Sequence, residues 1–279
     1  MTSGNPAVTS QDVAELYDRY SERTAALLGG SIHFGHWPDA AGGGSVAEAS
    51  DRMTRLMTDC LGAGPGDHVL DIGCGTGRPA LRLARTTGAS VTGITVSTRQ
   101  VHLATAAAAA EGLADRVVFR YADAADLPFP PGSFDAAWLF ESLLHMPDPR
   151  RVLLGIADVL RPGGRLAIAN VVERAPLPPE SRPALDTFCA LNRIAAVLPI
   201  TDYPALVADG GLVLERLTDV SDHSVPQTFG ALCATLRATE ADAPAEEDRE
   251  ERRSLLAAME RLAVTPEVGY AIVVASKPR

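Results

Sequence analysis

The chain has 279 residues, and its 35 Asp and Glu residues outnumber 25 Lys and Arg residues, which gives a formal charge of −10. Hydrophobic residues make up 46% of the chain, so the composition supplies a full core and excludes disorder over most of the length. The acidic balance excludes nucleic acid and anionic membranes as expected partners. The sequence has no basic leader, no apolar run of about 18 residues and no CxxC pair among its four cysteines, which favours a cytoplasmic protein with reduced thiols.

Helical and strand patterns alternate along the first two thirds of the chain. Helices are predicted at 11–28, with Ser10 as the cap, and at 45–61. Strands are predicted at 68–72, 90–95, 117–121, 134–140 and 165–172, and helices between them at 78–85, 99–111 and 150–160. This alternation predicts a parallel sheet with helices on both faces.

The pattern changes after residue 172, where several prolines mark a linker. Further helices are predicted at 185–198, 203–209 and, as one long stretch with an acidic middle, 227–262, and further strands at 212–220 and 269–277. The segments 176–200 and 225–265 therefore interrupt the strands of the sheet.

The most distinctive run is VLDIGCGTG (69–77), which ends a predicted strand and precedes a predicted helix. Gly73, Gly75 and Gly77 allow a sharp turn and a close approach of the backbone to a ligand. A glycine turn at the carboxyl end of a strand is where doubly wound folds hold nucleosides. The spacing GxGxG differs from the dinucleotide fingerprint GxGxxG, and the Lys of a phosphate-binding P-loop is missing.

This run resembles motif I of the class I S-adenosylmethionine (SAM) methyltransferases, in which Asp71 would organise the loop near the amino group of the cofactor. The run GITVSTRQ (93–100) lacks the ribose-binding acid of the generic family. It matches a subgroup with Thr or Ser at that point and a Gln five residues on. The run YADAADLPFP (121–130) resembles the adenine segment of the family. By this resemblance, the ribose is bound by Thr95, Val96 and Gln100, and the adenine is bound by Asp123 and the backbone amide of Ala124.

The N-terminal runs LYDRY and SIHFGHWPDA resemble the cap of the same subgroup. There Tyr17 contacts the methionyl portion, and Phe34 and Trp37 cover the cofactor and exclude water. Phe140, at the end of the fourth predicted strand, would lie against the sulfonium. Two histidines in the second run have no third ligand nearby, so no metal site is expected.

The resemblance runs from about residue 17 to residue 278. It extends to antibiotic-pathway sugar and alkaloid O-methyltransferases of the rebeccamycin and rifamycin types, to the spinosyn cyclases and to the cyclopropane synthases. It implies SAM as the cofactor and a doubly wound α/β fold with a seven-stranded, mostly parallel sheet. The implied parts are a helical N-terminal cap (1–61), a SAM-binding core (62–175), a helical lid over the acceptor site (176–200 and 225–265) and the rest of the core sheet (201–224 and 266–279).

Methyl transfer from SAM is an in-line displacement, so the enzyme aligns the reactants and excludes water. A hydroxyl nucleophile must also lose its proton, a task that suits a neutral His. His145 lies in the run SLLHM just after the fourth predicted strand, where O-methyltransferases of this kind carry a His. Glu141 would assist it. Asn170, at the end of the fifth predicted strand, could orient a hydroxyl but cannot act as a base.

The expected acceptor is a small-molecule natural product with a bulky hydrophobic body, methylated on a hydroxyl of that body or of its sugar. Two alternatives stay open: N- or C-methyl transfer on a natural product, and a SAM-bound cyclase of the same fold. The spinosyn cyclases do not carry a His at the position of His145, which favours methyl transfer over cyclisation for this chain. Either a monomer or a homodimer is compatible with the sequence.

Overall fold

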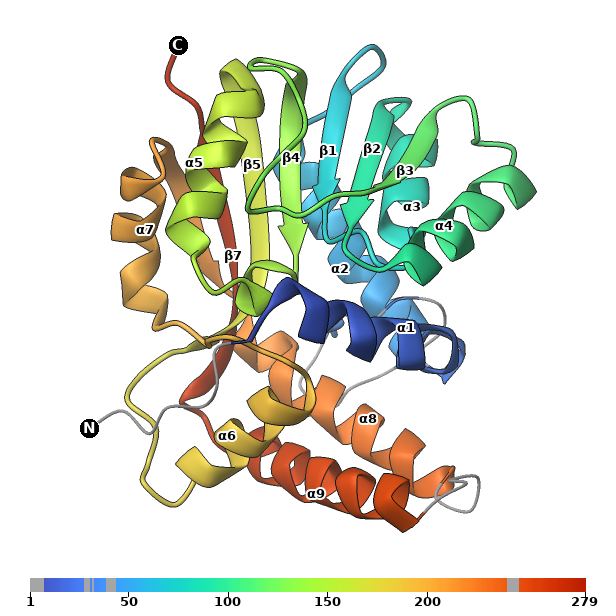
Figure 1. Ribbon diagram of the computed structural model, residues 1–279. Coiled ribbons are helices and arrows are strands. Elements are labelled where there is room, and N and C mark those ends of the chain that lie inside the picture. The colour runs from blue at the N-terminus through green and yellow to red at the C-terminus, as the bar shows by residue number, and fades with distance from the viewer. Residues whose placement is uncertain (1–7, 28–30, 32, 39–43, 240–245) are drawn as a thin grey trace.

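The computed structural model describes residues 8–27, 31, 33–38, 44–239 and 246–279. Its centre is one seven-stranded sheet with the strand order β3-β2-β1-β4-β5-β7-β6 (Figure 1). The strands are β1 (His68–Ile72), β2 (Ser90–Thr95), β3 (Val117–Tyr121), β4 (Phe134–Phe140), β5 (Leu160–Glu173), β6 (Val213–Asp219) and β7 (Val268–Ser276). All neighbouring strands are parallel except β7, which is antiparallel to both β5 and β6. The predicted doubly wound, mostly parallel sheet is confirmed.

Helices cover both faces of the sheet, because the central strands are apolar on both sides. In β5, Ala167 and Ala169 belong to one core cluster, and Leu166 and Ile168 belong to the other. The first cluster is covered by α2 (Val46–Leu61), α3 (Arg78–Thr87) and α4 (Thr98–Ala110), and the second by α5 (Pro149–Val159) and α7 (Tyr203–Asp209).

Helix α2 packs on the sheet although the sequence assigned it to the cap of residues 1–61. A capping box between Ser45 and Glu48 starts this helix, and Gly62 ends it in the left-handed conformation. Met53 and Met57 are fully buried in the core cluster that this helix shares with β5. Helix α1 (Ser10–Leu27), which belongs to the same predicted cap, crosses the carboxyl ends of the central strands (Figure 1).

The start of α1 differs from the prediction, which made Ser10 its cap. The Thr9 hydroxyl accepts from the Asp12 amide at 3.2 Å, and the Asp12 carboxylate accepts from the Thr9 amide at 2.8 Å. This reciprocal pair makes Thr9 the cap. The Ser10 hydroxyl is therefore free to bond elsewhere, and it donates to Asp123.

Three helices form a separate layer below the sheet in Figure 1: α6 (Arg182–Leu191), α8 (Val225–Ala238) and α9 (Glu246–Ala263). Both α6 and α8 pack against α9. The predicted helix at 185–198 is wrong in its second half, because it ends at Leu191 and Arg193 has a left-handed φ of 51°. The single helix predicted at 227–262 is also wrong. It consists of two helices, and residues 240–245 between them lie outside the described residues.

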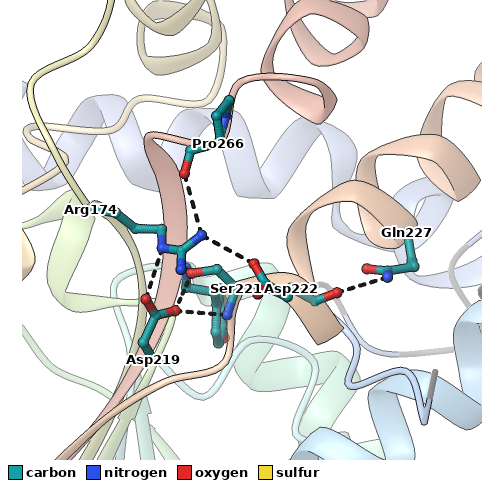
Figure 2. Close-up of polar contacts among 7 residues, drawn as sticks. Arg174, Asp219, Ser221, Asp222, Gln227 and Pro266 are labelled. Carbon is teal, nitrogen blue, oxygen red and sulfur yellow. Dashed lines mark hydrogen bonds and ion pairs between the residues drawn. The ribbon is translucent and has the colours of Figure 1, made fainter. Parts of the chain in front are cut away.

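The described residues also form short 3₁₀ helices, η1 (Leu143–His145), η2 (Ile200–Asp202) and η3 (Ser221–His223). A polar cluster holds η3 against the ends of β5 and β6 (Figure 2). The Arg174 guanidinium donates to Asp219 at 2.8 Å and to Asp222 at 3.1 Å, and the Asp219 carboxylate accepts from the Ser221 amide at 2.9 Å. The cluster therefore fixes the point where α8 leaves the sheet. Within the described parts of the chain, no helix is long and apolar enough to cross a membrane.

Candidate active site

A cavity of about 410 Å³ lies where the carboxyl ends of β1, β2 and β4 meet α1. Residues from every one of these elements line it. Of the site residues proposed from the sequence, it is lined by Tyr17, Asp71, Gly73, Gly75, Thr95, Val96, Gln100, Asp123, Ala124, Phe140, Glu141 and His145. Residues separated by more than a hundred positions thus converge on one space.

The three glycines after β1 are needed for different reasons. A Cβ at Gly73 would lie 2.3 Å from the Ser142 Cβ, and one at Gly77 would lie 2.6 Å from the Phe119 ring. These two positions are small because protein packs on them. A Cβ at Gly75 would meet no atom within 4 Å, although Gly75 borders the cavity and has a φ of 55°. Gly75 therefore leaves room for a ligand, whereas Gly77 is not a lining residue.

Asp71 lies near the carboxyl end of β1, and only 2% of its surface is exposed. Its Oδ2 atom has no hydrogen-bond partner among the described residues. Burial raises the pKa of Asp71 to about 7, because a carboxylate loses its hydration there. A cationic or donating group of a ligand in the cavity would supply the missing partner.

Asp123, which follows β3 and borders the cavity, is connected to α1 through Ser10. Asp123 Oδ1 accepts from the Ala125 amide at 2.8 Å, and its Oδ2 accepts from the Ser10 hydroxyl at 2.6 Å. The carboxylate is partly buried and borders the cavity. Ser10 was missed by sequence reasoning, because no local pattern links it to a residue 113 positions away.

Thr95 and Gln100 lie together at the end of β2. The Thr95 hydroxyl donates to Gln100 Oε1 at 2.7 Å, and both side chains are buried. Ser97 caps α4 by accepting from the Gln100 amide at 3.0 Å, and its hydroxyl bonds to Asp18 of α1. The bond between Ser97 and Asp18 is thus a second link between α1 and the sheet. It lies next to Thr95 and Gln100, whose polar side chains border the cavity.

His145, at the end of η1, has a polar partner on each ring nitrogen. Its Nδ1 lies 2.9 Å from the Arg193 carbonyl oxygen, and its Nε2 lies 3.0 Å from the Tyr17 hydroxyl. A carbonyl can only accept, so Nδ1 carries the hydrogen, and the Nε2 of the neutral ring accepts from Tyr17. Burial lowers the pKa of His145, which keeps the ring neutral at neutral pH, and burial raises the pKa of Tyr17.

Glu141 bonds to the N-terminal loop and the sheet rather than to His145. Its Oε1 accepts from the Phe34 amide at 2.5 Å and from the Tyr270 hydroxyl at 2.6 Å. Burial raises its pKa to about 7, and its φ of 53° is a strained value for a residue with a side chain. Among the described residues, Glu141 makes no hydrogen bond to His145, so no direct contact supports the expected assistance of Glu141 to the base.

Three other predicted site residues lie outside the cavity lining. Phe34 stacks on Tyr270 with ring centroids 5.4 Å apart, and the Trp37 indole donates to the Thr228 hydroxyl at 3.2 Å. Both rings pack between the loop and α8, so neither borders the cavity. Asn170 donates to the Tyr203 hydroxyl at 3.1 Å and borders a second cavity, described below.

His33 is a lining residue that the sequence did not assign to the cofactor. Its ring stacks on Phe140 with centroids 3.9 Å apart, and burial lowers its pKa to about 4. It is therefore a neutral aromatic wall, and its place in a loop rich in aromatic residues was the available signal. Among the residues that the structure describes, no three His, Cys, Asp or Glu side chains form a group that could hold a metal ion.

Comparison with known proteins identifies the family of this chain. A methyltransferase domain family matches residues 70–168. Methyltransferase GfsG of Streptomyces halstedii is 40% identical over 275 residues, covering 96% of this chain and 95% of that protein. The chain belongs to the SAM-dependent methyltransferases. The 27-O-demethylrifamycin SV methyltransferase of Amycolatopsis mediterranei is 38% identical over 78% of this chain and 79% of its own length.

A solved structure extends the similarity of this methyltransferase to its whole length. The crystal structure of the [4+2]-cyclase SpnF has a TM-score of 0.86 and 34% sequence identity, and the match covers 99% of both chains. The fold of the N-terminal helix and of the layer formed by α6, α8 and α9 is therefore shared with a protein whose described reaction is a cyclisation.

The residues present fit SAM. The cavity is bordered by Asp71, whose Oδ2 atom has no hydrogen-bond partner among the described residues, and by Asp123, whose carboxylate already accepts two hydrogen bonds. Between them, Gly75 leaves an open wall where any other side chain would fill the space. These groups suit the ammonium and the adenine amino group of the cofactor, and the polar atoms of Thr95 and Gln100 suit its ribose hydroxyls.

Proposed function

We propose that this methyltransferase transfers the methyl group of SAM to a hydroxyl of a bulky hydrophobic secondary metabolite, or of its attached sugar, in an antibiotic-type pathway. His145 acts as the general base. The observation that supports this most directly is the neutral His145 ring at the cavity, with its Nε2 lone pair accepting from another hydroxyl, that of Tyr17. The rifamycin relative, whose name specifies an oxygen as the methylated atom, supports the same reaction class.

The proposed proton transfer uses the two sides of the imidazole. The acceptor hydroxyl takes the place of the Tyr17 hydroxyl at Nε2 and donates its hydrogen bond there. As the oxygen forms its new bond to carbon, its proton passes to Nε2. The Arg193 carbonyl holds Nδ1–H on the other side, so the imidazolium that results keeps a hydrogen-bond acceptor. SAM, when bound, would supply a methyl group on a positively charged sulfur; the carbon–sulfur bond breaks as the carbon–oxygen bond forms, and its electron pair leaves with the sulfur, so that the step is balanced without further activation.

Helix α1 would exclude water from the reaction. It is tied to the sheet by Ser10 at Asp123, by Asp18 at Ser97 and by Tyr17 at His145. Because these three bonds hold α1 across the cavity, we expect α1 to open for the entry of SAM and to close afterwards. We also expect the segments 176–200 and 225–265 to act as a lid. Residues 195, 196 and 198 of the first segment line the second cavity, whereas no described residue of α6, α8 or α9 lines either cavity.

The proposal is tested by incubating the protein with isotopically labelled SAM and a panel of hydroxylated polyketides, alkaloids and their glycosides, each paired with an amine analogue. Mass spectrometry should find one added methyl group on an oxygen, with one S-adenosylhomocysteine (SAH) released per product. His145→Ala should lower turnover by about 10²–10⁴-fold and leave the calorimetric affinity for SAH nearly unchanged.

His102→Ala is the matched control, because His102 is exposed on α4 and should have no effect on turnover. Full activity of His145→Ala on the true acceptor would reject the base role and favour an amine or carbon nucleophile. A product of unchanged mass, formed without release of SAH, would instead identify a cyclase. The similarity to SpnF makes that the specific alternative.

A further inference from the structure

A second cavity of about 280 Å³ lies beside the turn that carries His145. Its wall includes Leu144 and Met146, the two neighbours of His145, and residues 195, 196 and 198 from the segment after α6. That segment is held in place because the left-handed Arg193 turns the chain back, and the Ala195 amide donates to the Leu144 carbonyl at 2.8 Å. The early end of α6 thus creates the cavity.

One wall of this cavity presents a polar pair in an otherwise apolar lining. Asn170 and Tyr203 are 2% and 1% exposed, and the Asn170 amide nitrogen donates to the Tyr203 hydroxyl at 3.1 Å. Asn170 Oδ1 has no partner among the described residues. The Tyr203 oxygen uses its acceptor capacity on Asn170, so its own hydrogen remains available for donation.

An unpartnered amide oxygen at 2% exposure costs free energy, so the site is incomplete without a partner. The space is large enough for an organic group, since a cavity of roughly 150 Å³ already holds benzene. One acceptor and one donor side by side match a neutral hydroxyl, which both donates and accepts. The lining residues include no charged side chain, which disfavours a carboxylate or an ammonium.

The second cavity adjoins the cofactor cavity, because Val8, Met146 and Pro147 border both. We infer that the second cavity is a subsite for the acceptor, and that it holds an apolar ring or chain whose hydroxyl bonds to Asn170 and Tyr203. This inference rests on the proposed function for the identity of the ligand. It requires an acceptor with two hydroxyl groups on one apolar body: one beside His145 that is methylated, and one at Asn170 that is only bound.

The binding test uses phenol and toluene as probes on the full chain saturated with SAH, so that the cofactor cavity is filled. With ¹³C-methyl-labelled methionine, phenol should shift the Met146 resonance along a saturable curve. Met53, Met57 and Met259, buried in the other core cluster, should stay unchanged. The ratio of phenol to toluene affinity should fall about tenfold in Asn170→Leu, which removes one hydrogen bond at similar size.

Tyr203→Phe provides a second variant in case the buried leucine prevents folding, and it should lower the same ratio. A ratio unchanged in every folded variant, or no saturable shift with either probe, would overturn the subsite. Neither measurement involves methyl transfer, so this result is independent of the proposed reaction. On an acceptor found in the labelled-SAM screen, Asn170→Leu should raise KM about tenfold while SAH affinity stays constant. An unchanged KM would show that the acceptor does not use the cavity.

Discussion

Gly75 should accept an added methyl group in the free protein but not in the complex with the cofactor. Its φ of 55° means that Gly75→Ala costs about 1–2 kcal/mol of folding free energy, the penalty of a left-handed alanine. No protein atom lies within 4 Å of the new Cβ, so no clash adds to that cost. The methyl group projects into the space that SAM needs, and overpacking there should weaken SAH binding by about 1–3 kcal/mol, or about fivefold to 150-fold.

Gly77→Ala is the matched control for this effect. It has a similar backbone penalty, with a φ of 86°, but its Cβ would lie 2.6 Å from the Phe119 ring and 2.9 Å from the Ala104 Cβ. Overpacking of about 1–3 kcal/mol then adds to the backbone strain. Gly77→Ala should therefore lose more folding free energy than Gly75→Ala, and less SAH affinity once folded.

Urea denaturation measures the first quantity for the two variants, and titration calorimetry with SAH measures the second. The reasoning fails if folded Gly75→Ala binds SAH as tightly as the wild type, since the loop would then not approach the cofactor. It also fails if Gly75→Ala is the less stable variant of the two, since the packing distances would then not determine the cost.

Three further measurements test individual side chains. The folded-state pKa of Asp71, about 7, lies above the ordinary value of 3.8 for an aspartate, so the folded form binds more protons between these values. Urea denaturation should accordingly show the free protein losing stability relative to Asp71→Asn as pH rises from about 4 to 7, by on the order of 4 kcal/mol, with no further change above that range. Asp123→Ala should weaken SAH binding by about 1–3 kcal/mol in calorimetry, whereas Ser10→Ala, which keeps the carboxylate, should weaken it less. Tyr17→Phe should raise the pKa of His145 toward its ordinary value in an NMR titration of the ring protons, because the donor that stabilises the neutral ring is lost; an unchanged titration would contradict the hydrogen bond.

The strands were predictable because their signal is local. The runs 68–72, 90–95, 117–121 and 134–140 have the bounds that the structure gives to β1–β4. Each is a short apolar stretch between polar or glycine-rich turns, a pattern that fixes both type and length. The glycine run identified the cofactor for the same reason, since its residues are contiguous.

The errors arise where a distant contact overrides a local preference. Thr9 and Ser10 are equally good caps by composition. In the structure Thr9 caps the helix through its two bonds with Asp12, whereas the Ser10 hydroxyl bonds to the distant Asp123. Residues 194–198 are apolar enough to continue a helix, yet the bonds to Leu144 turn them into the wall of a cavity. Such contacts cannot be inferred from neighbouring residues.

Asn170 illustrates a different limit. The sequence placed it correctly near the end of β5, but side chains alternate along a strand. Asn170 shares the parity of Ile168 and Val172, which pack in the cluster covered by α5 and α7. Predicting its position along the strand therefore did not predict the side of the sheet on which it acts.

The order of the strands also bears on how this enzyme can diversify. The glycine loop and the segments proposed to bind the ribose and the adenine follow β1, β2 and β3, at one end of the sheet. The helical layer leaves from β5, β6 and β7, at the opposite end, where the Arg174 cluster anchors it. Mutations that reshape α6, α8 or α9 thus accumulate far from the strands that retain the methyl donor. If this layer acts as the proposed lid over the acceptor, a lineage would exchange one acceptor for another in that half and inherit its donor affinity unchanged.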